Sequence, residues 1–400
     1  MNRYIALAAL LTACSQLASQ IFMPVLPDIA DSLSLSAGAS QAIIISFFLS
    51  LGSAQLLVGP LCDKYGERPI FVTGQVILII GTGICALAQD PNSFMVGRVL
   101  QGVGCAAPIL VSRAVLYACF QGAKLHSAMG TLAISASVVA LTTPLIAGTL
   151  AEQFSWQGMS FVLIGFYICI FIFGLAVFPK PEKKVVSLRP NALIISYKNI
   201  AKSPAFIPVA SLKWAPTFLY LTLQLYLPFF LRNEFAFTSE QIGQAMMISM
   251  SGLLIGSTLA KFMQKRTHHL QIAIYLWPAL PTSALTFLLL SEHVYAVIFA
   301  HCAIMFIFGS YFPSYMYYVG YFYKSRSSTA NALVGATELL LFSSIAWAAN
   351  QYLISGPESI ALLTAGCAFF VLVCLRALKK LSNIKIAHKG DELCNSKQHG

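Results

Sequence analysis

The chain alternates between long apolar runs and short polar ones from its first residues to about residue 380. Each apolar run is near 20 residues, the length of a helix that crosses a hydrocarbon layer ~30 Å thick. A backbone in lipid must satisfy its own hydrogen bonds, which such runs do as helices. The pattern predicts an all-α membrane protein with twelve spans, at residues 4–26, 40–60, 70–88, 94–118, 127–150, 159–178, 205–230, 240–260, 271–290, 295–319, 328–352 and 358–378.

Composition supports this pattern: 58% of the 400 residues are hydrophobic and 10% are charged, which excludes a soluble globular protein. The net charge of +11 does not indicate a nucleic-acid partner, because basic residues cluster in alternate loops. They concentrate at 180–203, 261–269, 324–326 and after 376, whereas the opposite loops are acidic and hold Arg232 as their one basic residue. This positive-inside bias predicts a membrane protein with both termini in the cytoplasm.

One longer basic connector divides the spans into six and six, the pattern of a transporter built from two related halves. We expect an N-terminal six-helix half at 1–179, a cytoplasmic linker at 180–203, a C-terminal six-helix half at 204–379 and a loose cytoplasmic tail at 380–400.

The ten cysteines show no repeated spacing, so we expect no metal site, disulfide framework or cofactor. "LLTAC", ending at Cys14, resembles a lipoprotein cleavage box, but the apolar run continues to Leu26 and we interpret it as the first helix. No reactive His or Asp cluster recurs at helical spacing, so we do not expect an enzyme.

Four short motifs carry a family resemblance. "GPLCDKYGERP" (59–69), after the second span, resembles the loop 2–3 signature of the major facilitator superfamily. "FMPVLPDIA" (22–30) resembles the end of the first helix in its Bcr/CflA-like branch of drug–proton antiporters. "RVLQGVGCAAP" (98–108) resembles the fourth-helix motif and "TTPLIAG" (142–148) a degraded fifth-helix antiporter motif, with matching residues Arg98, Gln101, Gly102, Gly104, Pro144 and Gly148.

The resemblance implies a conformational latch in the first motif. Gly59 would let helices approach closely and Gly66 would permit a tight turn. Asp63 would dock on the N-terminus of the eleventh helix in one transport state, with Arg68 and Arg113 among its partners. The alternative is a solvated turn that only obeys the positive-inside rule. Glu67 departs from the family, which usually has a basic residue at that position.

Three ionisable residues are expected inside the membrane, where they are functional candidates by default: Arg98, Lys213 and Glu338. Arg98 and Gln101 share a helix face and suggest a polar wall used in coupling; snorkelling of Arg98 to the interface is the alternative. Glu338 is either the protonatable coupling residue or the partner of Lys213 in a structural ion pair, and both readings stay open.

Candidate substrate contacts follow helix faces. One polar stripe at i, i+4, i+7 and i+11 of span seven should face water, substrate or a neighbouring helix. A group of aromatic residues in span ten forms either a cavity wall or a belt at the membrane interface. These residues are Lys213, Thr217, Tyr220 and Gln224, then Phe308, Tyr311 and Phe312. Gln20 holds the place where the resembled branch carries an acid, and it cannot carry a proton. Asp28 and Asp31 are interpreted as ordinary solvated acids.

The expected function is secondary active transport, because the sequence has no phosphate-binding loop and the energy should come from an ion gradient. We expect a monomer that interacts with a small-molecule substrate, protons and the lipid bilayer. Resemblance favours proton-coupled efflux of a drug-like compound across a bacterial inner membrane. Arg98 and Lys213 together with Gln20 favour an alternative, transport of an anionic metabolite such as a polycarboxylate siderophore, in either direction. A remote alternative is a transport-dead sensor or scaffold.

Overall fold

The computed structural model describes residues 3–178, 190–264, 266–323 and 327–398, and all regular structure within them is helical. The earlier helices are α1 (Arg3–Gln20), α2 (Leu26–Ser32), α3 (Ala37–Tyr65), α4 (Glu67–Leu87), α5 (Pro91–Cys119), α6 (Gly122–Val177) and α7 (Pro190–Ala201). The later ones are α8 (Phe206–Phe235), α9 (Ser239–Met263), α10 (His269–Leu276), α11 (Ala279–Leu289), α12 (Val294–Phe322), α13 (Ser327–Thr337), the π-helix η2 (Glu338–Phe342), α14 (Ser343–Tyr352) and α15 (Pro357–Gln398).

Ten segments of the described residues are long and apolar enough to cross a membrane. Helix α6 counts once among them, although its 56 residues would reach about 84 Å as one straight helix. Ser155, inside α6, takes φ 62° and ψ 169°, which no helix accommodates. The break separates the two spans predicted at 127–150 and 159–178. Together with α1, this makes the helices consistent with the twelve predicted spans.

Two predicted spans are interrupted by proline. The span expected at 4–26 ends as a helix at Gln20, and turns precede the short helix α2. The span expected at 271–290 divides into α10 and α11 around Pro278. Proline lacks the backbone N–H that an α-helix needs and crowds the residue before it. The expectation of one helix over 4–26 was therefore wrong, whereas the span predicted at 271–290 is retained as the apolar segment His269–Leu289.

The last helix differs from the prediction as well. Helix α15 continues to Gln398, whereas the sequence was expected to form a loose tail from residue 380. Residues 381–398 contain no proline and a single glycine, so nothing in their sequence breaks the helix.

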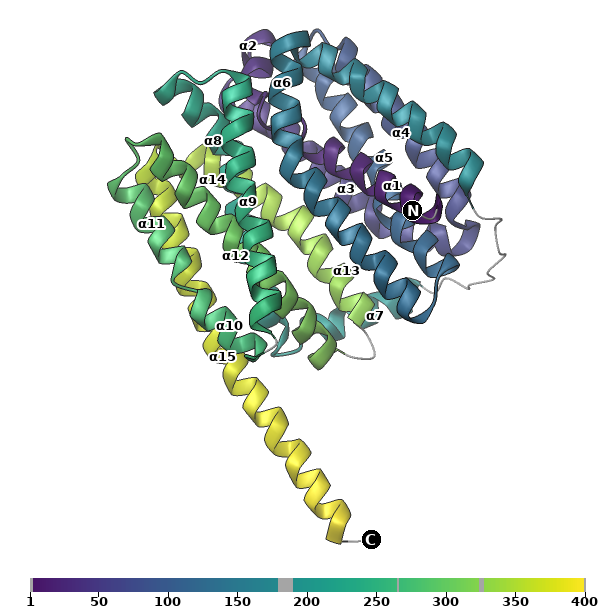
Figure 1. Cartoon of the computed structure of the whole chain (residues 1–400), viewed down its shortest axis with the longest axis vertical. Helices are drawn as coiled ribbons and strands as arrows, with labels where there is room; N and C mark the ends of the chain where they lie inside the picture. The colour runs from purple at the N-terminus through teal and green to yellow at the C-terminus, as the bar shows by residue number, and fades with distance from the viewer. Residues whose placement is uncertain (1–2, 179–189, 265, 324–326, 399–400) are drawn as a thin grey trace. The chain divides into compact units, whose positions relative to one another are not determined.

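The chain forms two compact units, each assembled from segments that are separate in the sequence. The first comprises residues 1–189, 221–251 and 335–354. Within it α5 packs against α1, α3 and α4, and α6 packs against α1 and α4 (Figure 1). Helix α3 also meets η2 and α14. Late segments of the chain thus belong to the same packed body as the first six spans.

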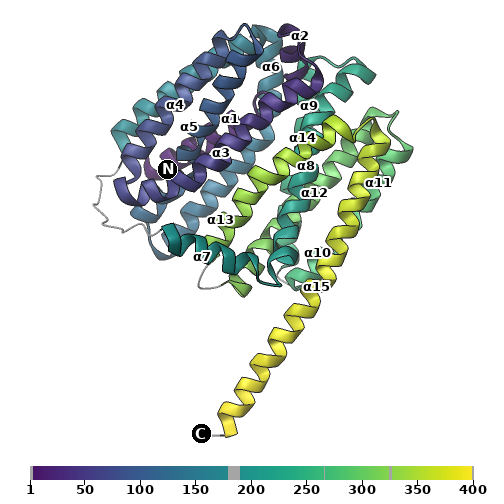
Figure 2. The same cartoon turned by 180° about the vertical axis from the view of Figure 1, so that it is seen from behind.

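The second unit comprises residues 190–220, 252–334 and 355–400. Helix α11 packs between α12 and α15, and α10 contacts the same two helices (Figure 2). Neither unit corresponds to a half predicted from the 180–203 linker, so that division stays a prediction about how the chain is duplicated.

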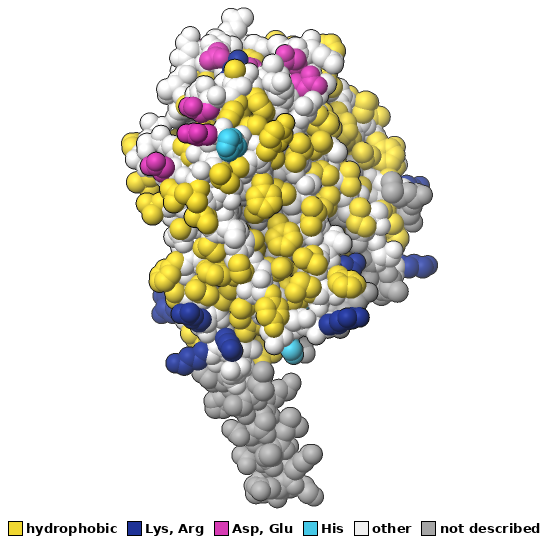
Figure 3. Space-filling model, turned by 60° about the vertical axis from the view of Figure 1, so that its left-hand side comes forward, with side chains coloured by type: hydrophobic (Ala, Val, Ile, Leu, Met, Phe, Trp, Pro, Cys, Tyr) yellow, Lys and Arg dark blue, Asp and Glu magenta, His cyan; other side chains and the backbone are white. Residues whose placement is uncertain are grey.

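Charged residues flank the apolar part of α15. Glu358 lies in its first turn and Lys380 lies 22 residues later, about 33 Å along a helix. Figure 3 shows hydrophobic side chains over much of one face. An apolar band of this height is what a membrane-spanning helix presents to lipid.

Candidate functional site

Arg98 is the centre of the polar contacts inside the first unit. It lies on α5 and is completely buried. Its Nη1 donates hydrogen bonds to the backbone oxygen of Ala18 at 3.0 Å and to Oε1 of Gln101 at 2.8 Å. Gln101 Nε2 in turn donates to Thr82 Oγ1 at 2.9 Å. This chain of hydrogen bonds joins α1, α5 and α4 through one guanidinium group.

Aromatic rings cover the same guanidinium. Its central carbon lies 4.3 Å from the ring centroid of Phe47 and 5.1 Å from that of Phe22. Both rings are buried, and the faces of such rings attract a cation. The rings therefore offset part of the cost of removing this charge from water. Because Arg98 has no exposed surface, snorkelling to the interface is excluded.

The charge of Arg98 has no acidic counterpart among the described residues. No described carboxylate forms an ion pair with it, and its Nε and Nη2 lack a hydrogen-bond partner there. A buried cation without a counter-charge costs several kcal/mol. The sequence singled out Arg98 and Gln101 together, and the structure brings them together with Thr82, which sequence reasoning did not identify.

Gln20 lies two residues after Ala18, whose oxygen binds Arg98, but its own side chain binds a different residue. It is the last residue of α1, and its Nε2 donates to Oε1 of Gln16 at 2.9 Å. Its Oε1 is buried without a partner among the described residues. Gln20 therefore retains a free acceptor at the end of α1.

The C-terminal part of α8 lies in the first unit and is held by side-chain amides. Gln41 Nε2 donates to the backbone oxygen of Leu225 at 2.9 Å, and Asn350 Nδ2 donates to that of Thr222 at 3.1 Å. Gln224, between these two, is buried, with Oε1 unpartnered among the described residues. Sequence reasoning found Gln224 from its stripe but missed Gln41 and Asn350, which are isolated polar residues in apolar runs.

The other stripe residues lie on the part of α8 that belongs to the second unit. Lys213 Nζ is 5.9 Å from the ring centroid of Tyr315, whose hydroxyl donates to Asn331 Oδ1 at 2.7 Å. The rings of Tyr220 and Phe308 lie 5.7 Å apart, and Thr217 is buried on the same helix. The structure thus brings the stripe to the aromatic face of α12.

The aromatic candidates on α12 lie in two different environments. Phe312 lies 6.2 Å from Tyr315 by ring centroids, on the side that Phe308 also occupies. Tyr311 is fully buried instead, and its hydroxyl donates to the backbone oxygen of Ala273 on α10 at 2.9 Å. A buried hydroxyl must find a partner, and this one finds it in a neighbouring helix.

Glu338 is the first residue of η2 and is 9% exposed. An ideal Cβ at Gly52 of α3 would lie 3.0 Å from Leu339 Cβ, so α3 packs tightly against this segment. Short π-helical segments inside α-helices are frequent at functional sites. Lys213 and Glu338 belong to different units, and their pairing stays a prediction.

The expected latch is only partly within the described structure. The side chains of Asp63 and Lys64 lie outside the described residues. Gly66 takes φ +84° as the one residue between α3 and α4, a conformation that favours glycine. No described atom lies within 4 Å of an ideal Cβ at Gly59, so this structure shows no close approach there. Arg68 and Arg113 are both exposed.

The small residues of the other motifs lie at close helix contacts. An ideal Cβ at Gly102 would lie 2.4 Å from the oxygen of Phe47, and one at Gly104 would lie 2.4 Å from the nitrogen of Leu78. An ideal Cβ at Gly148 would lie 2.3 Å from the backbone oxygen of Ser239. Pro144 is buried one turn earlier on α6, and its oxygen lies 2.4 Å from an ideal Cβ at Gly243.

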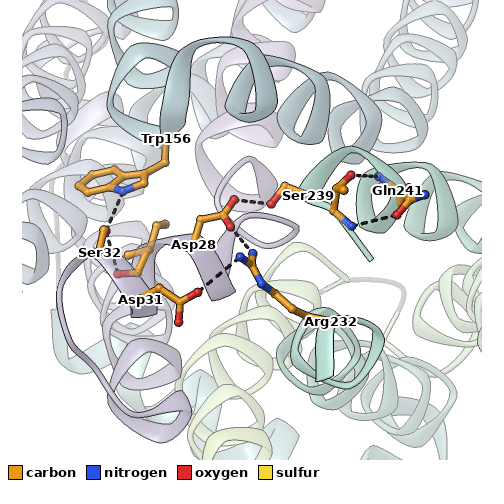
Figure 4. A network of polar contacts seen from close by, with 9 residues as sticks. Asp28, Asp31, Ser32, Trp156, Arg232, Ser239 and Gln241 are labelled. Carbon is orange, nitrogen blue, oxygen red and sulfur yellow. Dashed lines mark hydrogen bonds and ion pairs between the residues drawn. The ribbon is translucent and has the colours of Figure 1, made fainter. Parts of the chain in front are cut away.

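The interpretation of Asp28 and Asp31 as ordinary solvated acids was wrong for Asp28. Figure 4 shows Asp28 between Arg232 and Ser239, with Asp31 also facing Arg232. Arg232 and Ser239 are 204 and 211 positions from Asp28 in the chain, so sequence spacing could not pair them with it. The available signal was Arg232, the one basic residue among the acidic loops.

No group of three or more His, Cys, Asp or Glu side chains that could hold a metal occurs among the described residues. In the first unit the described residues place amides and two aromatic rings around a buried cation, and in the second they place aromatic rings near Lys213.

Comparison with known proteins identifies relatives of one kind. The model of the "Major Facilitator Superfamily" matches residues 8–347. "Multidrug resistance protein D" of Escherichia coli (strain K12) is 27% identical over 198 residues, 49% of this chain and 50% of that protein. "Bicyclomycin resistance protein homolog" of Haemophilus influenzae is 25% identical over 209 residues, 50% of this chain and 52% of that protein. The matches span about half the length of these curated relatives.

Solved structures share the fold over nearly the whole chain. A bacterial homologue of the human lysosomal transporter Spinster, in an inward-facing and occupied conformation, superposes with a TM-score of 0.68 at 13% identity, covering 95% of this chain and 96% of that chain. The nucleoside transporter NupG, as a point mutant, gives 0.71 at 14% identity, covering 95% and 99%.

Proposed function

Because the chain belongs to the Major Facilitator Superfamily, we propose that it is a proton-coupled exporter of a drug-like or small organic compound that works by alternating access. Its membership makes it a multi-pass inner-membrane transporter rather than an enzyme. The names of its relatives, which refer to multidrug and bicyclomycin resistance, support the drug-like class of substrate.

The observation that carries the coupling proposal is the buried charge of the first unit. Arg98 is buried with two donor atoms that have no partner among the described residues, and Glu338 is nearly buried at the start of a π-helix. Ionisable groups inside a membrane are costly and mark proton and substrate pathways. Protonation of a carboxyl removes its charge, so a proton can change which state of the transporter is favoured. We assign coupling to Arg98, Gln101 and Glu338.

We assign substrate contact to the stripe on α8 and the aromatic face of α12. Tyr220 and Phe308 present neighbouring rings beside Lys213, an arrangement that suits a bulky ligand with a polar group. Gln20 and Gln224 each keep a buried amide oxygen unpartnered among the described residues, and such an oxygen could accept a hydrogen bond from a ligand.

A second candidate function is transport of an anionic metabolite such as a polycarboxylate siderophore. Arg98 favours it, because no described acid pairs with this buried cation. Gln20 favours it too, since an amide at that place cannot balance a cationic substrate. The class of substrate is the point on which the two candidates differ.

The orientation, the latch and the oligomeric state complete the proposal. The distribution of basic residues supports cytoplasmic termini. The motif at 59–69, with Gly66 at a positive φ, supports a latch at the cytoplasmic end that involves Asp63, Arg68 and Arg113. We assign a monomer as the functional state.

Everted membrane vesicles with an acidified lumen and a pH-sensitive dye test the choice of substrate. Ethidium and citrate are added separately, and proton release is compared with vesicles that lack the protein. Release on ethidium supports the drug-like class, and release on citrate alone supports the anionic class. Flux of neither solute, with the protein correctly folded, contradicts both and favours a sensor or scaffold.

A further inference from the structure

A polar network surrounds α2, the short helix between α1 and α3 in the chain (Figure 4). Asp28, on the short helix α2, uses both carboxylate oxygens. Oδ1 pairs with Nη1 of Arg232, in the last turns of α8, and Oδ2 accepts a hydrogen bond from Oγ of Ser239, the first residue of α9. One carboxylate thus joins three helices.

The network is partly shielded from solvent. The side chains of Arg232 and Asp28 are 34% and 30% exposed, whereas that of Asp31 is 73% exposed. Arg232 Nη2 lies 3.4 Å from Asp31 Oδ2, a longer contact at the rim. Shielded, charge-assisted hydrogen bonds are stronger than exposed ion pairs, so Asp28 is the principal partner of Arg232 and Asp31 is peripheral.

Both sides of the network rest on α6. Trp156 Nε1 donates to Ser32 Oγ at 2.9 Å, which ties the end of α2 to α6 just past its break at Ser155. On the other side, the close contact of Gly148 with the backbone of Ser239 seats the start of α9 against α6. The charged residues therefore meet in a fixed geometry.

The segments that meet come from opposite parts of the chain. Asp28 lies on α2, which follows the first span, whereas Arg232 and Ser239 lie on α8 and α9, the helices that contain the seventh and eighth spans. In a transporter of this fold, alternating access requires the first six and the last six helices to separate at one end of the membrane and then at the other. Contacts between them at one end form only while that end is closed.

We propose that Asp28, Arg232 and Ser239 form a closure lock that holds the acidic end of the transporter shut and breaks in every transport cycle. The inference rests on the proposed transport function. With the termini in the cytoplasm, the lock closes the periplasmic side and complements a latch around Asp63 at the other side. A charge pair is suited to this role because water solvates both ions once the end opens.

Hydrogen–deuterium exchange of the full-length protein in nanodiscs tests the lock without any substrate. Asp28→Asn removes the charge but keeps the shape, and Asp31→Asn is the matched control at the rim. We expect Asp28→Asn to raise exchange severalfold in the peptides over 26–36 and 232–242, and Asp31→Asn to change it much less. Equal exchange in wild type and Asp28→Asn overturns the proposal.

Reversible cross-linking distinguishes a lock that must break from a static contact. A double variant, Asp28→Cys with Arg232→Cys, is treated with a short bifunctional methanethiosulfonate reagent, and each single variant receives the same treatment. We expect linked protein to lose flux of ethidium or citrate and to recover it on reduction. The reagent should leave the flux of each single variant at its value before treatment. Unchanged flux in fully linked protein overturns the proposal.

The two tests separate this proposal from the proposed function. If wild type moves neither solute, the proposed function fails, and the exchange measurement alone decides whether Asp28 closes this end. If the double variant is inactive before it is linked, the exchange measurement alone again decides whether Asp28 closes this end.

Discussion

At the scale of single residues, Arg98 is the most informative side chain. It is a fully buried cation whose charge is met by a carbonyl, an amide and two rings rather than by an acid among the described residues. Such an arrangement does not maximise stability, because a buried charge without a counter-ion is costly. A residue retained at that cost is a candidate for function.

Arg98→Gln separates these effects. We expect transport to fall by at least about tenfold, on the order of 1.4 kcal/mol in the barrier, while the melting temperature stays equal or rises because a buried charge is gone. Flux and thermal unfolding of the purified variant provide the measurements. Arg376→Gln, at an exposed position on α15, is the control and should change neither. A large loss of stability with normal transport per folded molecule would make Arg98 structural.

Tyr311 illustrates the opposite case, a residue whose visible role is structural. Its hydroxyl donates to Ala273 on α10, and we expect Tyr311→Phe to cost about 1 kcal/mol of stability, the usual net value of such a bond. Substrate affinity should stay unchanged, whereas Tyr220→Leu should raise the KM for an aromatic solute. Unfolding and flux measured on both variants check the contrast; a raised KM in Tyr311→Phe alone would reverse these assignments.

At the scale of helices, close packing depends on glycine at particular places. At Gly148 an added Cβ would lie 2.3 Å from a backbone oxygen of α9, which cannot move without shifting that helix. Elsewhere on α6, Gly165 has no neighbour within 4 Å of its ideal Cβ. The two positions therefore allow a matched comparison on one helix.

We expect Gly148→Ala to destabilise the protein by about 1–3 kcal/mol through overpacking. Gly165→Ala should be neutral or slightly stabilising, because alanine is the better helix former. Thermal unfolding in detergent compares the two variants directly. Equal melting temperatures would show that α6 and α9 do not pack as closely as the structure indicates.

The sequence predicted helices better than it predicted their interruptions. Hydropathy located the spans because lipid imposes one length and one composition on them. It did not place the end of α1 at Gln20 or the π-helix at Glu338, because both depend on local hydrogen bonding inside an apolar run. The break at Pro278 had a visible signal that hydropathy outweighed.

The site shows the same limit. Motif resemblance found Arg98 and Gln101, and helical spacing found the stripe from Lys213 to Gln224. Thr82 and the pairing of Asp28 with Arg232 were missed, because these contacts join residues far apart in the chain. Only the packed structure brings such residues together.

At the scale of the whole molecule, family membership makes the chain a transporter, and its fold is shared with solved structures over nearly the whole chain. The central claim is that a proton gradient drives movement of a small solute through it. The proposal assigns coupling to ionisable residues of the first unit and substrate contact mainly to aromatic residues of the second.

The most direct test uses purified protein in sealed liposomes with an imposed pH gradient. The account predicts that the gradient drives ethidium or citrate against its concentration, that a proton ionophore abolishes this movement, and that Glu338→Gln abolishes it without unfolding the protein. Movement that ignores the gradient and the Glu338 substitution, or no movement of either solute by folded protein, would contradict the account.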